Sequence, residues 1–94
     1  MNHKLKILPK CFQAAYNQDK TFEVRKKDCD FKIGDGVILM EWDEQKQMYT
    51  GRQMGVNITY TLDDPKYCKE GYIIFSFECG AACMDYSEEY LKVR

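Results

Sequence analysis

The segment 18–25, Gln-Asp-Lys-Thr-Phe-Glu-Val-Arg, places a lysine, a glutamate and an arginine at fixed offsets along one short extended stretch. Side chains alternate between the two faces of a strand, so Glu23 and Arg25 share one face. Phe22 and Val24 share the opposite face, and the pattern predicts that this apolar face enters a core while the charged face lines a cleft. A guanidinium in a cleft can bind phosphate, carboxylate or a base edge. The alternative is a surface ion pair between Glu23 and Arg25.

Charge is unevenly distributed along the chain, although the net charge is only -1. Residues 1–32 contain eight Lys or Arg against four Asp or Glu, whereas residues 33–94 contain six against eleven. The near-neutral total argues against a basic protein that coats duplex nucleic acid. An anion-binding surface is therefore expected in the N-terminal third, which contains the segment 18–25.

The start of the chain lacks the apolar run of a secretory signal. No segment approaches the roughly 20 consecutive apolar residues that cross a membrane. We therefore expect a cytoplasmic protein that does not bind membranes.

The five cysteines are scattered along the chain: Cys11, Cys29, Cys68, Cys79 and Cys83. They lack the paired short spacings of a disulfide framework or a zinc site, so we expect reduced thiols, no metal and no cofactor. The one histidine, His3, is expected to lie in a mobile N-terminus, away from every cysteine. A thiol enzyme is therefore not expected.

Hydrophobic periodicity predicts one helix near the N-terminus. Pro9 suits the first turn of this helix. Phe12, Ala15 and Tyr16 follow at the spacing of one apolar helical stripe. Asn17 is expected in the left-handed conformation that ends the helix.

Alternating and apolar runs predict strands over 4–8, 21–26, 37–42, 54–62 and 72–77. The run 37–42 is almost continuously apolar and is expected to be buried on both faces. Residues 43–51 are expected to form a hairpin loop, with continued strand pairing through Met48 and Tyr49 as the alternative. The segment 81–94 has the charge order of a short C-terminal helix. The fold class is therefore α+β, mostly β: a small antiparallel barrel with an N-terminal helix.

The chain resembles the ASCH family, whose barrel is similar to that of PUA domains. The resemblance depends on the motif Lys-x-x-Glu-x-Arg, matched by Lys20, Glu23 and Arg25, and on a Phe-Lys-x-Gly-Asp turn at 31–35. The family's motif begins with a glycine at the position that Gln18 occupies here.

Within that family, the chain looks most like a small branch of uncharacterised bacterial and phage proteins. The resemblance covers residues 3–77, the expected core of a single ASCH-like domain over 1–94. It leaves the tail, 78–94, without a counterpart.

The ASCH resemblance implies binding of RNA or of a modified or ordinary nucleotide in a cleft beside the motif. Lys20 and Arg25 would contact phosphate, and Glu23 would accept a hydrogen bond from a base. Thr21 belongs to the same segment. Trp42 is a secondary candidate that could stack on an unpaired base, or else a core or rim residue.

Two other functions stay open. A second ASCH branch contains small amidohydrolases that act on acetylated cytidine, and such an enzyme would use Lys20 and Glu23. That branch has a threonine three residues after its lysine, where this chain has Glu23, so a protein without catalysis is favoured. The third function is a bacterial or phage interaction module whose tyrosine-bearing tail, 84–91, binds a protein partner.

Overall fold

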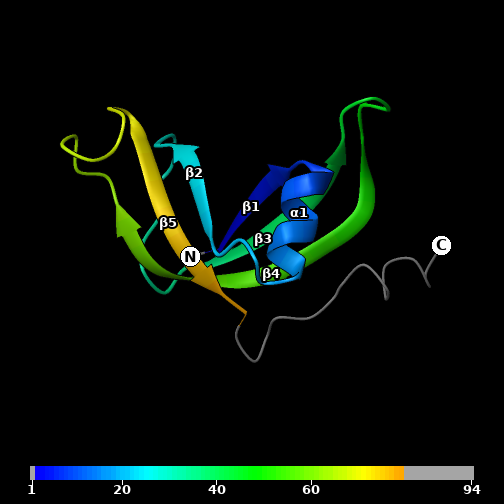
Figure 1. Cartoon of the computed structure of the whole chain (residues 1–94), viewed down its shortest axis with the longest axis horizontal. Helices are drawn as coiled ribbons and strands as arrows, with labels where there is room; N and C mark the ends of the chain where they lie inside the picture. The colour runs from blue at the N-terminus through cyan, green and yellow to red at the C-terminus, as the bar shows by residue number, and fades with distance from the viewer. Residues whose placement is uncertain (1, 80–94) are drawn as a thin grey trace.

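The computed structural model describes residues 2–79, which form a strongly curved five-stranded sheet and one helix (Figure 1). In chain order the elements are β1 (Asn2–Ile7), α1 (Pro9–Tyr16), β2 (Phe22–Lys26), β3 (Gly36–Asp43), β4 (Met48–Leu62) and β5 (Tyr72–Glu78). This is the expected α+β, mostly β class. The helix expected over 81–94 lies outside the described residues. Within the described part of the chain, no helix has the length and apolar character needed to span a membrane.

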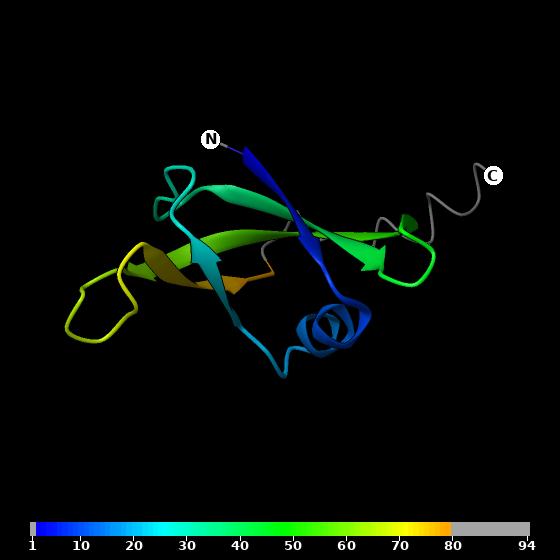
Figure 2. The ribbon, with the colours of Figure 1, turned by 90° about the horizontal axis from the view of Figure 1, so that it is seen from above.

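The strand order is β1-β3-β4-β5-β2, so the first two strands of the chain lie at opposite edges of the sheet. Three of the strand pairs are antiparallel, but β1 runs parallel to β3. The prediction of an all-antiparallel sheet is therefore wrong for this pair. Parallel neighbours require a crossover, and α1 together with β2 supplies it. The curved sheet forms a half-barrel whose edges, β1 and β2, approach each other (Figure 2).

The concave face of the half-barrel holds the core, and α1 packs there against β3. Three core side chains, Phe12, Leu39 and Phe75, have no solvent exposure. The buried apolar residues are Ile7, Phe12, Ala15, Phe31, Val37, Leu39, Met54, Val56, Ile58, Ile73, Phe75 and Phe77.

The end of α1 sets the direction in which the chain enters β2. Gln18, and not Asn17 as predicted, has the left-handed conformation, with φ 65° against −78° at Asn17. The backbone N–H groups of Asp19 and Lys20 then both donate to the Ala14 carbonyl, at 2.9 and 3.1 Å. This turn satisfies a carbonyl at the helix end and holds Lys20 against α1.

The strands β3 and β4 differ from prediction in two respects. In β3, Val37, Leu39 and Glu41 face inward and are buried, whereas the alternate residues are only half-buried. The prediction that this strand is buried on both faces is therefore wrong for its outer face. The strand β4 begins at Met48, six residues before its predicted start and after a turn in which Gln47 has φ 52°; the pairing continues through Met48 and Tyr49, which was the alternative for this loop.

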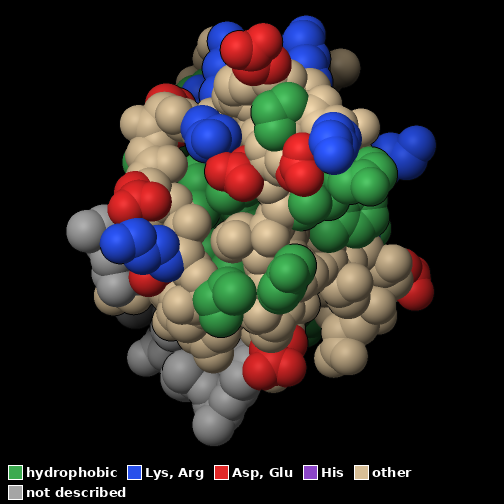
Figure 3. Space-filling view, turned by 90° about the vertical axis from the view of Figure 1, so that its left-hand side faces the viewer, with side chains coloured by type: hydrophobic (Ala, Val, Ile, Leu, Met, Phe, Trp, Pro, Cys, Tyr) green, Lys and Arg blue, Asp and Glu red, His purple; other side chains and the backbone are tan. Residues whose placement is uncertain are grey.

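The charged face of β2 lines a pocket, as predicted, but its apolar face points to solvent and not into the core. Phe22 and Val24 are 47% and 51% exposed, while Glu23 is only 5% exposed. The pairing register explains this orientation, because Glu23 lies opposite Phe75, whose side chain points into the core. Directly paired residues share one face of a sheet, so Glu23 points inward and its neighbours point to solvent. Figure 3 shows one side of the molecule, where exposed hydrophobic side chains lie among charged ones.

Candidate functional site

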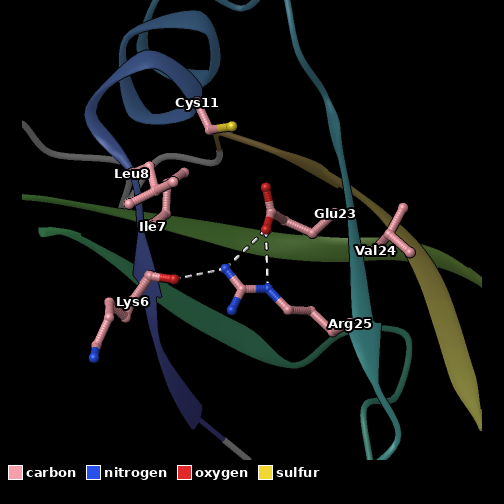
Figure 4. A pocket seen from close by; sticks show the side chains of 7 residues that line it. All are labelled: Lys6, Ile7, Leu8, Cys11, Glu23, Val24 and Arg25. Carbon is pink, nitrogen blue, oxygen red and sulfur yellow. Dashed lines mark hydrogen bonds and ion pairs between the residues drawn. The ribbon is translucent and has the colours of Figure 1, made fainter. Parts of the chain in front are cut away.

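A pocket of about 240 Å³ lies between the edge strands β1 and β2 and the start of α1 (Figure 4). Its lining combines apolar side chains with the charged pair of the 18–25 segment. The residues that line it are Lys6, Ile7, Leu8, Cys11, Glu23, Val24 and Arg25.

Glu23 is a buried carboxylate held by two cations. Its Oε1 accepts from Nε of Arg25 at 3.0 Å and lies 2.9 Å from Nη2 of the same guanidinium. Its Oε2 pairs with Nζ of Lys20. A buried carboxylate is tolerated only when partners replace its lost hydration, and these two cations do so. The cluster of three groups keeps one net positive charge.

Arg25 also connects the two edges of the sheet. Its Nη2 donates to the backbone carbonyl of Lys6 on β1 at 2.8 Å. Figure 4 shows the guanidinium between Glu23 and this carbonyl, while the Lys6 ammonium points away. The remaining nitrogen, Nη1, has no hydrogen-bond partner within residues 2–79, and the Arg25 side chain is 26% exposed. Arg25 is therefore fixed in position with one donor group available beside the pocket.

Lys20 is held close to the backbone of its own segment. Its Nζ donates to the Phe22 carbonyl at 2.7 Å in addition to its pairing with Glu23. The side chain is 21% exposed, and Lys20 is not one of the described residues that line the pocket. Lys20 therefore neutralises Glu23 from outside the lining.

The other two predicted site residues lie elsewhere. Thr21 lines a separate pocket of about 260 Å³ beside the ends of α1 and β5. Trp42 lies on the outer face of β3, where its ring packs edge-on against Tyr49, with centroids 4.9 Å apart, and under Nζ of Lys6 at 4.0 Å. The structure therefore brings together Lys20, Glu23 and Arg25 but not Thr21 or Trp42.

A second buried carboxylate, Glu41, was not identified from the sequence. It is 5% exposed, accepts from Oγ1 of Thr50 at 2.7 Å and lies 3.7 Å from Nη1 of Arg52. The Arg52 guanidinium also lies over the Phe12 ring of α1, 4.7 Å from its centroid. The alternation of Glu41 with two buried residues of β3 was the signal that could have revealed it.

His3 is also buried, so the prediction of a mobile N-terminus away from every cysteine is wrong. It is 8% exposed, and its Nε2 lies 2.7 Å from Oδ2 of Asp35. This hydrogen bond is the main reason that the pKa of Asp35 falls to about 2, against the opposing effect of burial. Sγ of Cys29 lies 3.9 Å from Nδ1 of the same ring. The alternation of His3 with Leu5 and Ile7 along β1 could have placed the ring on the inner face.

Among residues 2–79, no three His, Cys, Asp or Glu side chains are arranged to hold a metal ion.

Comparison with known proteins gives a family and a relative. The chain is 36% identical over 61 residues to an uncharacterized 12.9 kDa protein in GpA 3'region of Escherichia phage P2; these residues are 65% of this chain and 54% of the phage protein. The chain thus spans about half the length of that relative. The profile of a domain of unknown function, DUF3850, matches residues 2–77, which include every group of the pocket. The chain belongs to the DUF3850 family.

Proposed function

We propose that this chain is a binding module for single-stranded RNA or a nucleotide, and that the pocket between β1 and β2 contacts a phosphate group of the ligand. The observation that carries the proposal is the fixed guanidinium of Arg25, which is held by Glu23 and by the Lys6 carbonyl and keeps one nitrogen available. A prepositioned guanidinium loses little conformational entropy when it binds phosphate. We also propose that the half-barrel is related to the ASCH and PUA-like domains.

The local charge supports an anionic ligand. Lys20 and Arg25 share a single carboxylate, so the cluster is positively charged within a chain whose net charge is -1. Binding that depends on these cations should weaken as salt concentration rises, because salt competes for the phosphate.

The size and lining of the pocket favour partial burial of the ligand. Pockets that enclose a drug-sized ligand measure about 300 to 1,000 Å³, and this one measures about 240 Å³. Leu8 and Val24, which are 46% and 51% exposed, offer apolar contact beside the charged groups. A phosphate and its sugar would fill such a pocket, leaving the base along the surface.

Binding without catalysis is favoured over the amidohydrolase alternative. Both oxygens of Glu23 are engaged by cations, which is the arrangement of a structural ion cluster. The hydroxyl-bearing residue of the motif, Thr21, lines a different pocket. Nucleophilic catalysis needs a nucleophile and its base within hydrogen-bond reach, and the motif residues do not provide that pair. The protein-interaction alternative depends on 84–91, outside the described residues.

The test is a titration of the pure protein with short single-stranded RNAs, matched DNAs and free nucleotides, at low and high salt. Arg25→Ala should weaken binding about tenfold or more, equivalent to losing one charge-assisted contact. Arg52→Ala is the matched control, because Arg52 also pairs with a buried glutamate but does not line this pocket.

Equal losses in the two variants, or no response to any ligand, would overturn the proposal. Release of acetate from an acetylated cytidine, abolished in Lys20→Ala, would instead support the amidohydrolase.

A further inference from the structure

The loop between β2 and β3 returns to β1 and brings a cysteine, a histidine and an aspartate into a line. Sγ of Cys29 lies 3.9 Å from Nδ1 of His3, and Nε2 of the same ring lies 2.7 Å from Oδ2 of Asp35. Cys29 and Asp35 belong to this loop, whereas His3 is distant from both in the sequence, and the parallel pairing of β1 with β3 places His3 near Asp35. This order of thiol, imidazole and carboxylate is the arrangement of an activated nucleophile, its base and the group that orients the base.

The hydrogen bonds determine which imidazole nitrogen can accept a proton. Asp35 is ionised, and its Oδ2 also accepts from the backbone N–H of Lys32 at 3.1 Å. An ionised carboxylate only accepts hydrogen bonds, so Nε2 of His3 carries the proton. In the neutral ring the lone pair is then on Nδ1, the nitrogen that faces Cys29.

Burial differs between the base and the thiol. His3 and Asp35 are 8% and 7% exposed, and the His3 ring packs against Phe31 with centroids 4.7 Å apart. The imidazole is therefore held in one orientation. Cys29 lies at the surface, where a reagent can reach its sulfur.

The surroundings of Cys29 disfavour a resting thiolate. Partial burial raises the pKa of this thiol most, followed by the charge of Asp28, a hydrogen bond to the Asp28 carboxylate and the charge of Asp30. At neutral pH the sulfur therefore keeps its proton, and reaction requires a base to remove it. Nδ1 of His3, 3.9 Å from the sulfur, is the nitrogen base of this cluster.

We propose that Cys29 is a nucleophilic modification site for soft carbon electrophiles, with His3 as the base and Asp35 as the residue that positions it. With iodoacetamide, the sulfur would form an S–C bond as the C–I bond breaks and iodide leaves. The thiol proton would pass to Nδ1 of His3, and the imidazolium, stabilised by Asp35, would then release a proton to water. This site is separate from the proposed nucleotide pocket, and neither proposal depends on the other.

The test measures the rate at which iodoacetamide labels each cysteine, read by mass spectrometry, in the native chain and in the same chain unfolded in urea at the same pH. Base assistance by His3 predicts that Cys29 reacts roughly tenfold faster in the native chain. Without help from His3, Cys29 should react more slowly in the native chain than in the unfolded chain, because its burial and the neighbouring carboxylates raise the pKa of its thiol. Cys11, half-buried in α1, is the internal control and should react more slowly when native. A native rate for Cys29 at or below its unfolded rate would overturn the proposal.

A variant separates the base from simple exposure. His3→Gln should reduce the native rate of Cys29 about tenfold while leaving that of Cys11 unchanged, with folding verified by circular dichroism. An unchanged Cys29 rate in folded His3→Gln would also overturn the proposal. If this variant fails to fold, the comparison of native and unfolded chain still decides the question.

Discussion

Arg25 on β2 donates a 2.8 Å hydrogen bond to the carbonyl oxygen of Lys6 on β1 and so joins the two edges of the half-barrel. These strands lie at opposite ends of the sheet order. Unpaired strand edges are liable to pair with other chains, and a side chain that joins them limits the exposed backbone. The residue proposed to bind phosphate therefore also holds the half-barrel together.

Arg25→Ala should lower the free energy of unfolding by about 1 to 3 kcal/mol, because the variant leaves Glu23 buried with only Lys20 as its partner. Urea denaturation measures this change. The control is Lys27→Ala, which removes an exposed pair with Asp63 and should change stability by less than about 0.5 kcal/mol. Equal losses of unfolding free energy in the two variants would show that Arg25 does not stabilise the buried carboxylate of Glu23.

Gln18→Gly should raise the free energy of unfolding by about 0.5 to 1 kcal/mol, because glycine adopts the observed φ of 65° without steric cost. Thermal or urea unfolding measures the shift. Asn17→Gly is the matched control one residue earlier, where φ is −78° and glycine should destabilise by a similar amount. Destabilisation by Gln18→Gly would contradict the role of this turn.

Acid should remove the contribution of the Asp35–His3 hydrogen bond. The pKa of Asp35 is lowered from 3.8 to about 2 on folding, so the ionised carboxylate stabilises the fold above pH 4. This contribution is lost as pH falls from about 4 to about 2. The difference in unfolding free energy between the unchanged chain and Asp35→Asn should therefore shrink as pH falls from about 4 to about 2. Urea denaturation between pH 6 and pH 2 measures the difference, and a pH-independent gap would refute the assignment.

Phe22→Ser should change the free energy of unfolding by less than about 1 kcal/mol, because this side chain faces solvent on the outer side of β2. Phe75→Ala, on the neighbouring strand but inside the core, should cost about 3 to 5 kcal/mol. Chemical denaturation measures the free energy of unfolding of both variants. A large effect of Phe22→Ser would restore the original expectation that Phe22 belongs to the core.

Local patterns in the sequence determined much of the secondary structure. Pro9 predicted the start of α1, and alternating and apolar runs predicted β1, β2, β3 and β5 to within two residues at each end, whereas β4 begins six residues before its predicted start. The three charged residues of the motif, Lys20, Glu23 and Arg25, also lie together in one ion cluster, because they are near neighbours in the chain. Short-range steric preferences and side-chain alternation are sufficient for such features.

Only the tertiary structure decided which way each face points and which distant residues meet. Alternation shows that Glu23 and Arg25 share a face, but it was the pairing with Phe75 that turned this face inward. The contacts of His3 with Asp35 and Cys29 join positions 32 and 26 residues apart. Such contacts depend on strand order and register, which follow from packing the whole chain into one core and not from any local pattern.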